Sequence, residues 1–198
     1  DYPATIRPAL RIIGTRPDVR KACGMYMVIT KTRVTFLADT TINIDPDAQT
    51  LAEIARLAAE RVRELGIEPR VAMLSFSNFG DAPHPASRKV AEATALVKKC
   101  CPELMIDGEM QANVAMDPQE RKRYPFSDLR GPANVLVFPN LDAGNAAYKL
   151  LAVAGGADVI GPTVDPHGRS ERVTKVCIGT PACSQASAKD AAPRESVA

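Results

Sequence analysis

Tryptophan is absent from this 198-residue chain, and aromatic residues make up only 5% of it. Hydrophobic residues still account for 45%, so the core must be mainly aliphatic, as is typical of parallel sheets covered by helices. No hydrophobic run approaches the roughly 20 residues of a membrane span, and the N-terminus has no signal-peptide pattern. The formal net charge is only +2. These absences predict a cytoplasmic protein that binds neither a membrane nor nucleic acid.

Sequence signatures of metal and nucleotide sites are also missing. The chain has no GxGxxG, P-loop, HExxH or GxSxG pattern. Its two His lie far along the chain from any Cys, and none of its five Cys forms a CxxC pair: they are Cys23, Cys100, Cys101, Cys177 and Cys183. We therefore expect no metal site, no bound cofactor and reduced thiols, as in a cytosolic protein.

Apolar runs and helical stripes alternate through the middle of the chain. Two short runs around Lys31 and Thr32 predict a β-hairpin. Beyond the hairpin, strands are expected over 71–76, 104–106, 134–138 and 157–160, and helices over 51–65, 87–99, 109–116 and 142–154. Strands separated by helices predict an α/β fold with a mainly parallel sheet and helices on both faces. Residues 118–132 are polar and charged, and we expect them to be exposed.

The composition changes near the C-terminal end of this pattern. Residues 163–198 contain no aromatic residue, Leu or Met. We therefore expect three parts: a short N-terminal segment with the start of the hairpin (1–32), an α/β domain (33–162), and an unstructured or aberrant tail (163–198).

Polar residues follow the expected strand over 71–76. Ser75, Ser77, Asn78 and Gly80 offer hydroxyls, an amide and an unhindered backbone, which can bind phosphate or carbonyl oxygens. The alternative is an ordinary Ser-Asn-Gly turn without a ligand.

A second group follows the expected strand over 104–106. Asp107 and Glu109 can serve acid–base chemistry or bind a cation, or they can simply favour the start of the next helix. Asn113 and Asn145 can face the same crevice. Because parallel strands place their carboxyl ends at one edge of a sheet, we expect Ser75, Ser77, Asn78, Asp107, Asn113 and Asn145 to converge there.

Several longer motifs resemble the phosphate acetyl/butyryltransferase family, in particular the version at the C-terminus of bacterial NADP-dependent malic enzymes. The resemblance covers roughly residues 6–162 and keeps the family's motif order. Its motifs are Asp39-Thr-Thr-Ile-Asn43, Leu51-Ala-Glu-Ile-Ala55, the Ser77–Gly80 turn, Asp107-Gly-Glu-Met-Gln111 and the segment 134–145. It implies the second α/β domain of that fold, with coenzyme A or acetyl-CoA as ligand. It also implies an acyl-CoA or acyl phosphate partner, a malic enzyme catalytic domain in a parent chain, and a homo-oligomer.

Two departures from the family pattern concern catalysis. The family's Ser-Arg-Gly stretch is missing after Gly161-Pro162, and Phe79 stands where the family turn has Lys. The resemblance therefore implies a domain that is catalytically degenerate for acyl transfer and serves acyl-CoA-responsive regulation or oligomerisation, with no catalytic residue assigned. An active phosphate acyltransferase and an incomplete structural remnant are the alternatives.

The composition of the tail leads to the first prediction. Ordering the backbone costs about 1–2 kcal/mol per residue, and residues 165–198 have too little apolar surface to offset that cost. Amide hydrogen exchange should find this segment unprotected. Strong protection across 173–178 would contradict the prediction.

Overall fold

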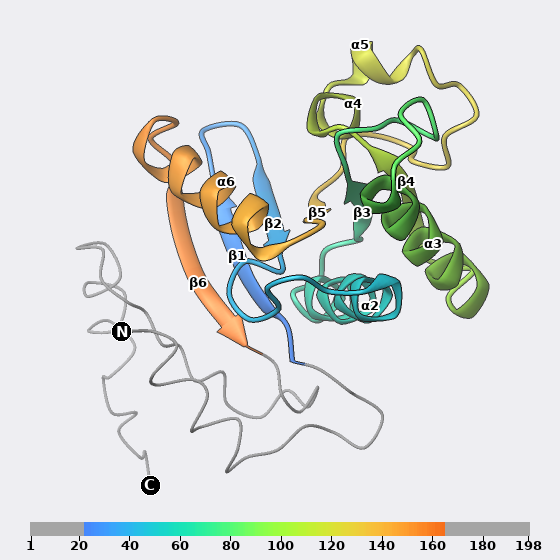
Figure 1. The fold of residues 1–198 in the computed structure, drawn as a ribbon. Coiled ribbons are helices and arrows are strands. Elements are labelled where there is room, and N and C mark those ends of the chain that lie inside the picture. Colours follow the sequence, from blue (N-terminus) through green and yellow to red (C-terminus); the bar gives the residue numbers. More distant parts are fainter. Residues whose placement is uncertain (1–21, 165–198) are drawn as a thin grey trace, which may run out of the picture.

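The computed structural model describes residues 22–164, which form a six-stranded sheet with helices on both faces (Figure 1). In chain order the elements are β1 (Gly24–Ile29), β2 (Val34–Ala38), α2 (Ala48–Glu64), β3 (Arg70–Leu74), α3 (Pro85–Cys100), β4 (Met105–Met110), α4 (Ala112–Met116), α5 (Pro118–Arg121), β5 (Val135–Val137), α6 (Leu141–Val153) and β6 (Asp158–Val164). Among the described helices, none combines the length and the apolar character that a membrane crossing needs. The predictions made for residues 1–21 and 165–198, including the unstructured tail, lie outside the described residues.

The strand order is β4-β3-β5-β2-β1-β6. β3 pairs in parallel with both β4 and β5, and β5 pairs in parallel with β2. Only β1 is reversed, since it is antiparallel to both β2 and β6. The β1–β2 hairpin is closed by a hydrogen bond from the Thr30 amide to the Arg33 carbonyl oxygen, at 3.0 Å. The predicted α/β class, the mainly parallel sheet and the hairpin are confirmed.

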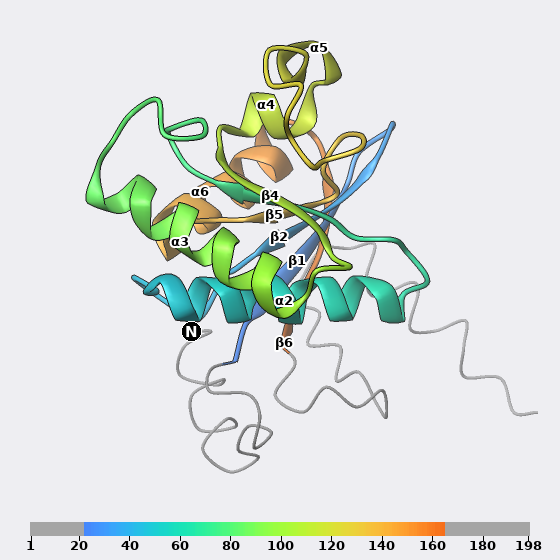
Figure 2. The same ribbon diagram turned by 90° about the vertical axis from the view of Figure 1, so that its right-hand side faces the viewer.

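Helices α2 and α3 cover one face of the sheet and run beside each other (Figure 2). The apolar stripe of α2, which includes Leu51, Ile54 and Val62, is fully buried, as its spacing predicts. Asp47 caps the start of α2 by accepting a 2.8 Å hydrogen bond from the Thr50 amide. These interactions fix α2 directly after the loop that leaves β2.

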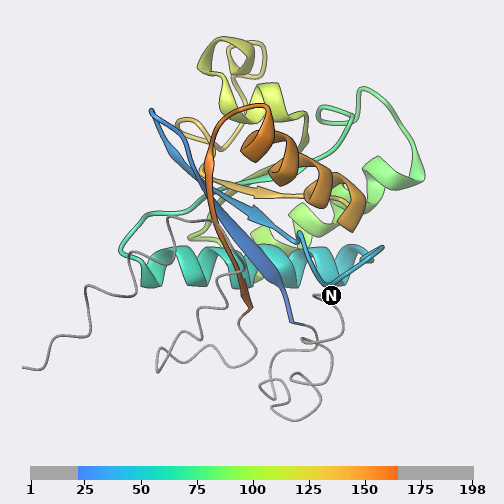
Figure 3. The ribbon, with the colours of Figure 1, turned by 90° about the vertical axis from the view of Figure 1, so that its left-hand side faces the viewer.

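The other face is covered by α4, α6 and the segment that leads into β5. Figure 3 shows the sheet lying between α2 and α6. α6 approaches the sheet very closely at Gly144: a Cβ atom built there would lie 2.5 Å from the carbonyl oxygen of Asp39. A small residue at this position therefore lets α6 lie directly on the end of β2.

The prediction for β4 was wrong in its boundaries. The strand does not end at Ile106 but continues to Met110, and the helix that follows begins at Ala112 instead of Glu109. Gly108 makes the extension possible, because it has a φ of +145° and a Cβ there would lie 2.6 Å from the Met73 carbonyl oxygen. Asp107 and Glu109 thus lie within the strand and do not cap a helix.

The segment 118–132 is mostly exposed or half-buried, as predicted, but it is not without structure. It contains the short helix α5, and Leu129 packs into the second core cluster. Its polar residues take part in hydrogen bonds with β4, described below. Polar composition alone did not reveal that this segment is packed on the edge of the sheet.

Gly144 provides a test in which two physical effects have opposite signs. Helix propensity alone predicts that Gly144→Ala stabilises the protein by about 0.5–1 kcal/mol. We expect instead a loss of about 1–3 kcal/mol in the free energy of unfolding, because the added methyl group collides with backbone atoms of Asp39. Urea denaturation measures the difference. Ala146→Ser, at an exposed position of the same helix, is the control, and a stabilised Gly144→Ala variant would contradict the close packing.

Candidate functional site

The candidate site lies at the edge of the sheet where the parallel strands have their carboxyl ends. Loops leave β2, β3, β4 and β5 at this edge. Open α/β sheets bind ligands there because polar loop groups and helix N-termini come together. Two groups of polar side chains lie at this edge and a third lies along the edge strand β4, and most of the predicted site residues are divided among them.

The first group, which we call the Ser77 corner, consists of Ser77, Asn78, Gly80, Asp81 and Glu109. The Ser77 hydroxyl oxygen lies 2.9 Å from Glu109 Oε1 and 2.9 Å from Asp81 Oδ1. The Gly80 amide donates to Glu109 Oε1 at 2.7 Å, and the Asn78 amide donates to Asp81 Oδ1 at 2.8 Å. Two carboxylates therefore organise the turn that follows β3.

Further hydrogen bonds attach this turn to the end of β4. The Ser75 and Phe79 amides donate to the carbonyl oxygens of Met110 and Glu109, at 2.9 and 2.8 Å. The Asn78 side-chain oxygen accepts from the Gln111 amide at 2.8 Å. Ser77 and Asn78 are buried, and their polar atoms are engaged within the protein. A ligand at this corner would meet the outer atoms of the turn, including the half-buried side chain of Ser75.

Two carboxylates of the Ser77 corner differ from their sequence interpretation. The sequence allows acid–base chemistry or a helix start for Glu109, but this residue is buried and bonded to the turn after β3. Asp81 was not identified from the sequence, although its position four residues after Ser77 in a Gly-containing turn is a signal for such a contact. The Asn78 amide, and next the Ser77 hydroxyl, hold the pKa of Asp81 below its ordinary value.

Phe79 stands at the apex of the same turn, with a φ of 49°, which is uncommon for a residue other than glycine. Its ring packs against Tyr124 and Phe126, with centroid distances of 5.2 and 4.9 Å. The Phe126 side chain remains 66% exposed. The apex of the turn therefore presents an aromatic surface without a positive charge.

The second group surrounds Asp39, directly after β2. This carboxylate is only 2% exposed. Its Oδ1 accepts from the amides of Gly24, Thr41 and Ile42, at 3.2, 2.8 and 3.1 Å. Its Oδ2 accepts from the amide and the side chain of Asn43, at 2.8 and 2.6 Å. Asp39 thus determines the shape of the loop between β2 and α2, and its role is structural.

Asn145 belongs with this second group and not with the Ser77 corner. Its side chain lies on α6 and donates to the Thr40 carbonyl oxygen at 3.4 Å. One turn further along α6, Tyr148 stacks on Tyr26 of β1 with ring centroids 4.2 Å apart. The half-buried amide of Asn145 therefore lies between α6 and the β2 loop.

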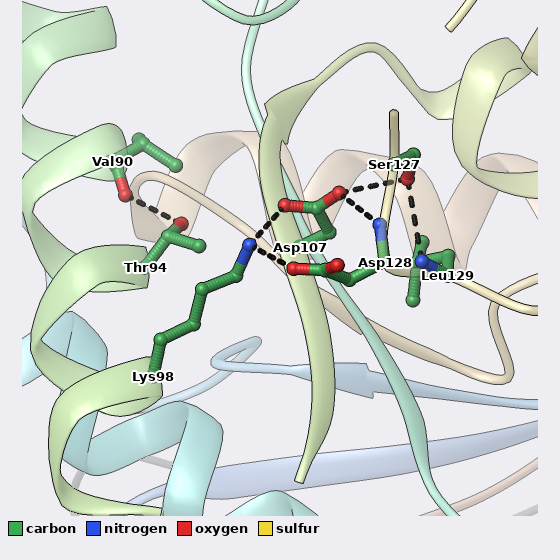
Figure 4. A network of polar contacts seen from close by, with 7 residues as sticks. All are labelled: Val90, Thr94, Lys98, Asp107, Ser127, Asp128 and Leu129. Carbon is green, nitrogen blue, oxygen red and sulfur yellow. Dashed lines mark hydrogen bonds and ion pairs between the residues drawn. The ribbon is translucent and has the colours of Figure 1, made fainter. Parts of the chain in front are cut away.

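The third group is centred on Asp107 (Figure 4). Asp107 Oδ1 pairs with Lys98 Nζ at 2.7 Å, and its Oδ2 accepts from the Ser127 hydroxyl at 2.7 Å and from the Asp128 amide at 2.9 Å. Lys98 also pairs with the Asp128 carboxylate at 2.7 Å. Burial acts to lower the pKa of Lys98, but hydrogen bonds and charges from the two Asp residues outweigh it and raise that pKa. This group joins α3, β4 and the segment after α5.

The structure therefore brings together only part of the predicted set. Ser75, Ser77, Asn78 and Gly80 lie in one turn, whereas Asp107 and Asn145 belong to other hydrogen-bond groups. Asn113 is exposed on α4. Within residues 22–164, no three His, Cys, Asp or Glu side chains are placed to hold a metal ion together.

Comparison with known proteins identifies the family. Residues 1–174 match the family model described as phosphate acetyl/butaryl transferase. This chain is a member of that family. The match agrees with the resemblance in the motifs at the carboxyl edge of the sheet.

Two curated relatives represent two kinds of family member. A phosphate acetyltransferase from Bacillus subtilis is 45% identical over 159 residues, which is 80% of this chain and 49% of the relative. An NADP-dependent malic enzyme from Escherichia coli is 45% identical over 166 residues, which is 83% of this chain and 22% of the relative. The chain thus spans about half of the first protein and about a fifth of the second.

Solved structures agree with this assignment. The EutD phosphotransacetylase from Staphylococcus aureus has a TM-score of 0.77 and 39% identity, over 87% of this chain and 54% of that protein. A phosphotransacetylase from Streptococcus pyogenes has a TM-score of 0.79 and 39% identity, over 84% of this chain and 53% of that protein. Fold and family are therefore shown by sequence and structure together.

The lowered pKa of Asp81 predicts how stability depends on pH. A carboxylate whose folded-state pKa lies below its ordinary value of 3.8 stabilises the fold above that pH, and this stabilisation is lost as pH falls through the folded pKa. We expect Asp81→Asn to be less stable than the wild type at pH 7, with a difference that shrinks below about pH 4. Urea midpoints between pH 2 and pH 7 measure this. Asp158→Asn, at an exposed position of β6, is the control, and a difference independent of pH would contradict the role of Asp81.

Proposed function

We propose that this chain is an acyl-CoA-responsive regulatory and subunit-contact domain, catalytically degenerate for acyl transfer, from a cytoplasmic NADP-dependent malic enzyme. Its functional unit would be the domain at 33–162 together with β1, which pairs with β2 and β6 in the same sheet. The thiols of Cys100 and Cys101, which form no disulfide, support a reducing compartment. The malic enzyme relatives support the parent chain, since a domain of this size occupies about a fifth of their length.

The observation that supports this proposal most directly is the aromatic apex at Phe79. Groups that handle phosphoryl oxygens are typically positively charged or are free main-chain amides. Here the apex is an aromatic ring packed on Tyr124 and Phe126, and the nearby Gly80 amide already donates to Glu109. No Lys or Arg of residues 22–164 forms an ion pair with Asp81 or Glu109. This charge distribution disfavours an acyl phosphate at the Ser77 corner.

The sequence supports the same conclusion about transfer chemistry. The family resemblance implies a Ser-Arg-Gly stretch after the Gly-Pro pair, and residues 163–198 contain none. Without groups that activate and orient a thiol, the activation free energy of the transfer reaction is not lowered by positioning. That lowering can be worth about 7–11 kcal/mol. A coenzyme A thioester requires no such groups merely to bind.

For ligand contact we consider the polar side chains at the carboxyl edge that can still form hydrogen bonds to a ligand. Ser75, half-buried beside the Ser77 corner, and Asn145, half-buried beside the β2 loop, have capacity for further hydrogen bonds. We propose that these atoms contact the acyl or pantetheine part of acetyl-CoA. Basic groups for its phosphates would come from another part of the parent protein, so binding by this chain should be weak.

Subunit contact is assigned to α6. Leu150 is 65% exposed and Val153 is 88% exposed; Leu151 of the same helix and Ile160 of β6 are 36% and 39% exposed. A contiguous apolar face on a helix is typical of surfaces that pack against protein. We propose that this face meets a second copy of the chain in a homo-oligomer, or the malic enzyme catalytic domain of the parent chain.

An active phosphate acyltransferase is the second candidate. It would transfer an acetyl group between coenzyme A and phosphate. The phosphate acetyltransferase and phosphotransacetylase relatives, at 39–45% identity, favour it. An incomplete structural remnant without ligand binding is the third.

One set of experiments on the purified 198-residue chain separates these possibilities. We expect no acetyl transfer from acetyl phosphate to coenzyme A. Calorimetry should detect acetyl-CoA binding that weakens by about 3–10-fold in Ser75→Ala and in Asn145→Ala, as expected for one lost hydrogen bond each. Thr32→Ala, at the exposed turn of the hairpin, is the control and should bind as the wild type does.

The other outcomes are equally decisive. Turnover that is abolished by Ser77→Ala would establish the active enzyme. Neither turnover nor binding would indicate the structural remnant. If the chain binds weakly, fusing it to the preceding half of the Bacillus subtilis relative should strengthen binding; equal affinity would place the site elsewhere.

A further inference from the structure

Two neighbouring thiols lie at the end of α3, away from the candidate site. Cys100 is the last residue of the helix, and Cys101 follows it as the C-cap. Their sulfur atoms are 3.4 Å apart. Cys100 is exposed and Cys101 is partly exposed, whereas Cys23 is buried. The pair is therefore accessible to a ligand and already oriented with both sulfurs toward each other.

We propose that Cys100 and Cys101 form a bidentate binding site for a soft, three-coordinate ion of the arsenic(III) class. Thiolate sulfur is the ligand that soft ions prefer. If each metal–sulfur bond is about 2.3 Å, as for zinc, a sulfur separation of 3.4 Å corresponds to an angle of about 95° at the ion. That angle suits a pyramidal three-coordinate centre better than the wider angle of a tetrahedral one.

A direct disulfide between the two residues is less favourable. Cα atoms joined by a disulfide are usually about 4.4–6.8 Å apart, but adjacent residues across a trans peptide are held at about 3.8 Å. Such a disulfide would be strained and readily reduced. A bridging ion removes this constraint, because the sulfurs keep nearly their present separation.

The chemistry of capture needs no oxidant. An organic arsenoxide, R–As=O, condenses with two thiols: both S–H bonds and the As=O bond are replaced by two As–S bonds, and one water leaves. Arsenic remains in the +3 state. Burial, with a further contribution from Cys100, raises the pKa of the Cys101 thiol to about 11, so this residue reacts as a thiol whose proton ends on the departing oxygen.

The test uses phenylarsine oxide and the full 198-residue chain under reducing conditions. We expect one phenylarsenic unit per chain by intact mass, retained in excess monothiol and released by a small dithiol. Cys100→Ser and Cys101→Ser should each lower the affinity by about 100-fold or more, because the second bond of a chelate forms intramolecularly.

Controls separate this pair from the remaining thiols. Cys23→Ser and the double variant Cys177→Ser/Cys183→Ser should bind like the wild type. Full binding by either single variant at 100 or 101 would overturn the proposal.

Discussion

Buried carboxylates that accept main-chain N–H groups determine the shape of the carboxyl edge of this sheet. Asp39 accepts hydrogen bonds from an amide at the start of β1 and from amides in the loop after β2. Glu109 accepts a hydrogen bond from an amide in the turn after β3. An ionised group is costly to bury unless it is fully hydrogen-bonded, so the surrounding loops have few alternative conformations that keep these bonds. The helices that follow, α2 and α3, begin where these loops place them.

The edge strand β4 shows how a polar strand can remain stable at the border of a sheet. Asp107 faces three donors from two other segments, and Lys98 spans Asp107 and Asp128. The segment 122–131 is thereby attached to this edge strand through the Asp107 carboxylate. The same segment brings Tyr124 and Phe126 against Phe79, so the packing of the β4 edge and the surface of the Ser77 corner are linked through one stretch of chain.

Much of the fold could be predicted from the sequence because its signals are local and repeated. The stripe of α2, the uninterrupted apolar residues of β3 and β5, and the hairpin all follow from periodicity. β4 could not be predicted fully, since its last residues are polar and their partners lie far along the chain: Glu109 meets Ser77, and Asp107 meets Ser127. The predicted topology placed the loops after the parallel strands at one edge, as in the structure, but periodicity does not specify which polar side chains hydrogen-bond to one another. Asp81 and the true partner of Asn145 became evident only from three-dimensional contacts.

The reversed strand β1 has a consequence for how this unit is joined to the rest of a protein. Gly24, where β1 begins, is paired with Val164, where β6 ends, so the chain enters and leaves the sheet at neighbouring points. A unit connected in this way can be inserted into a longer polypeptide, or attached to its end, without separating the flanking sequences. Because both ends lie at one point, a rotation of the whole sheet about that point would change its orientation relative to a neighbouring domain while leaving every strand pairing intact.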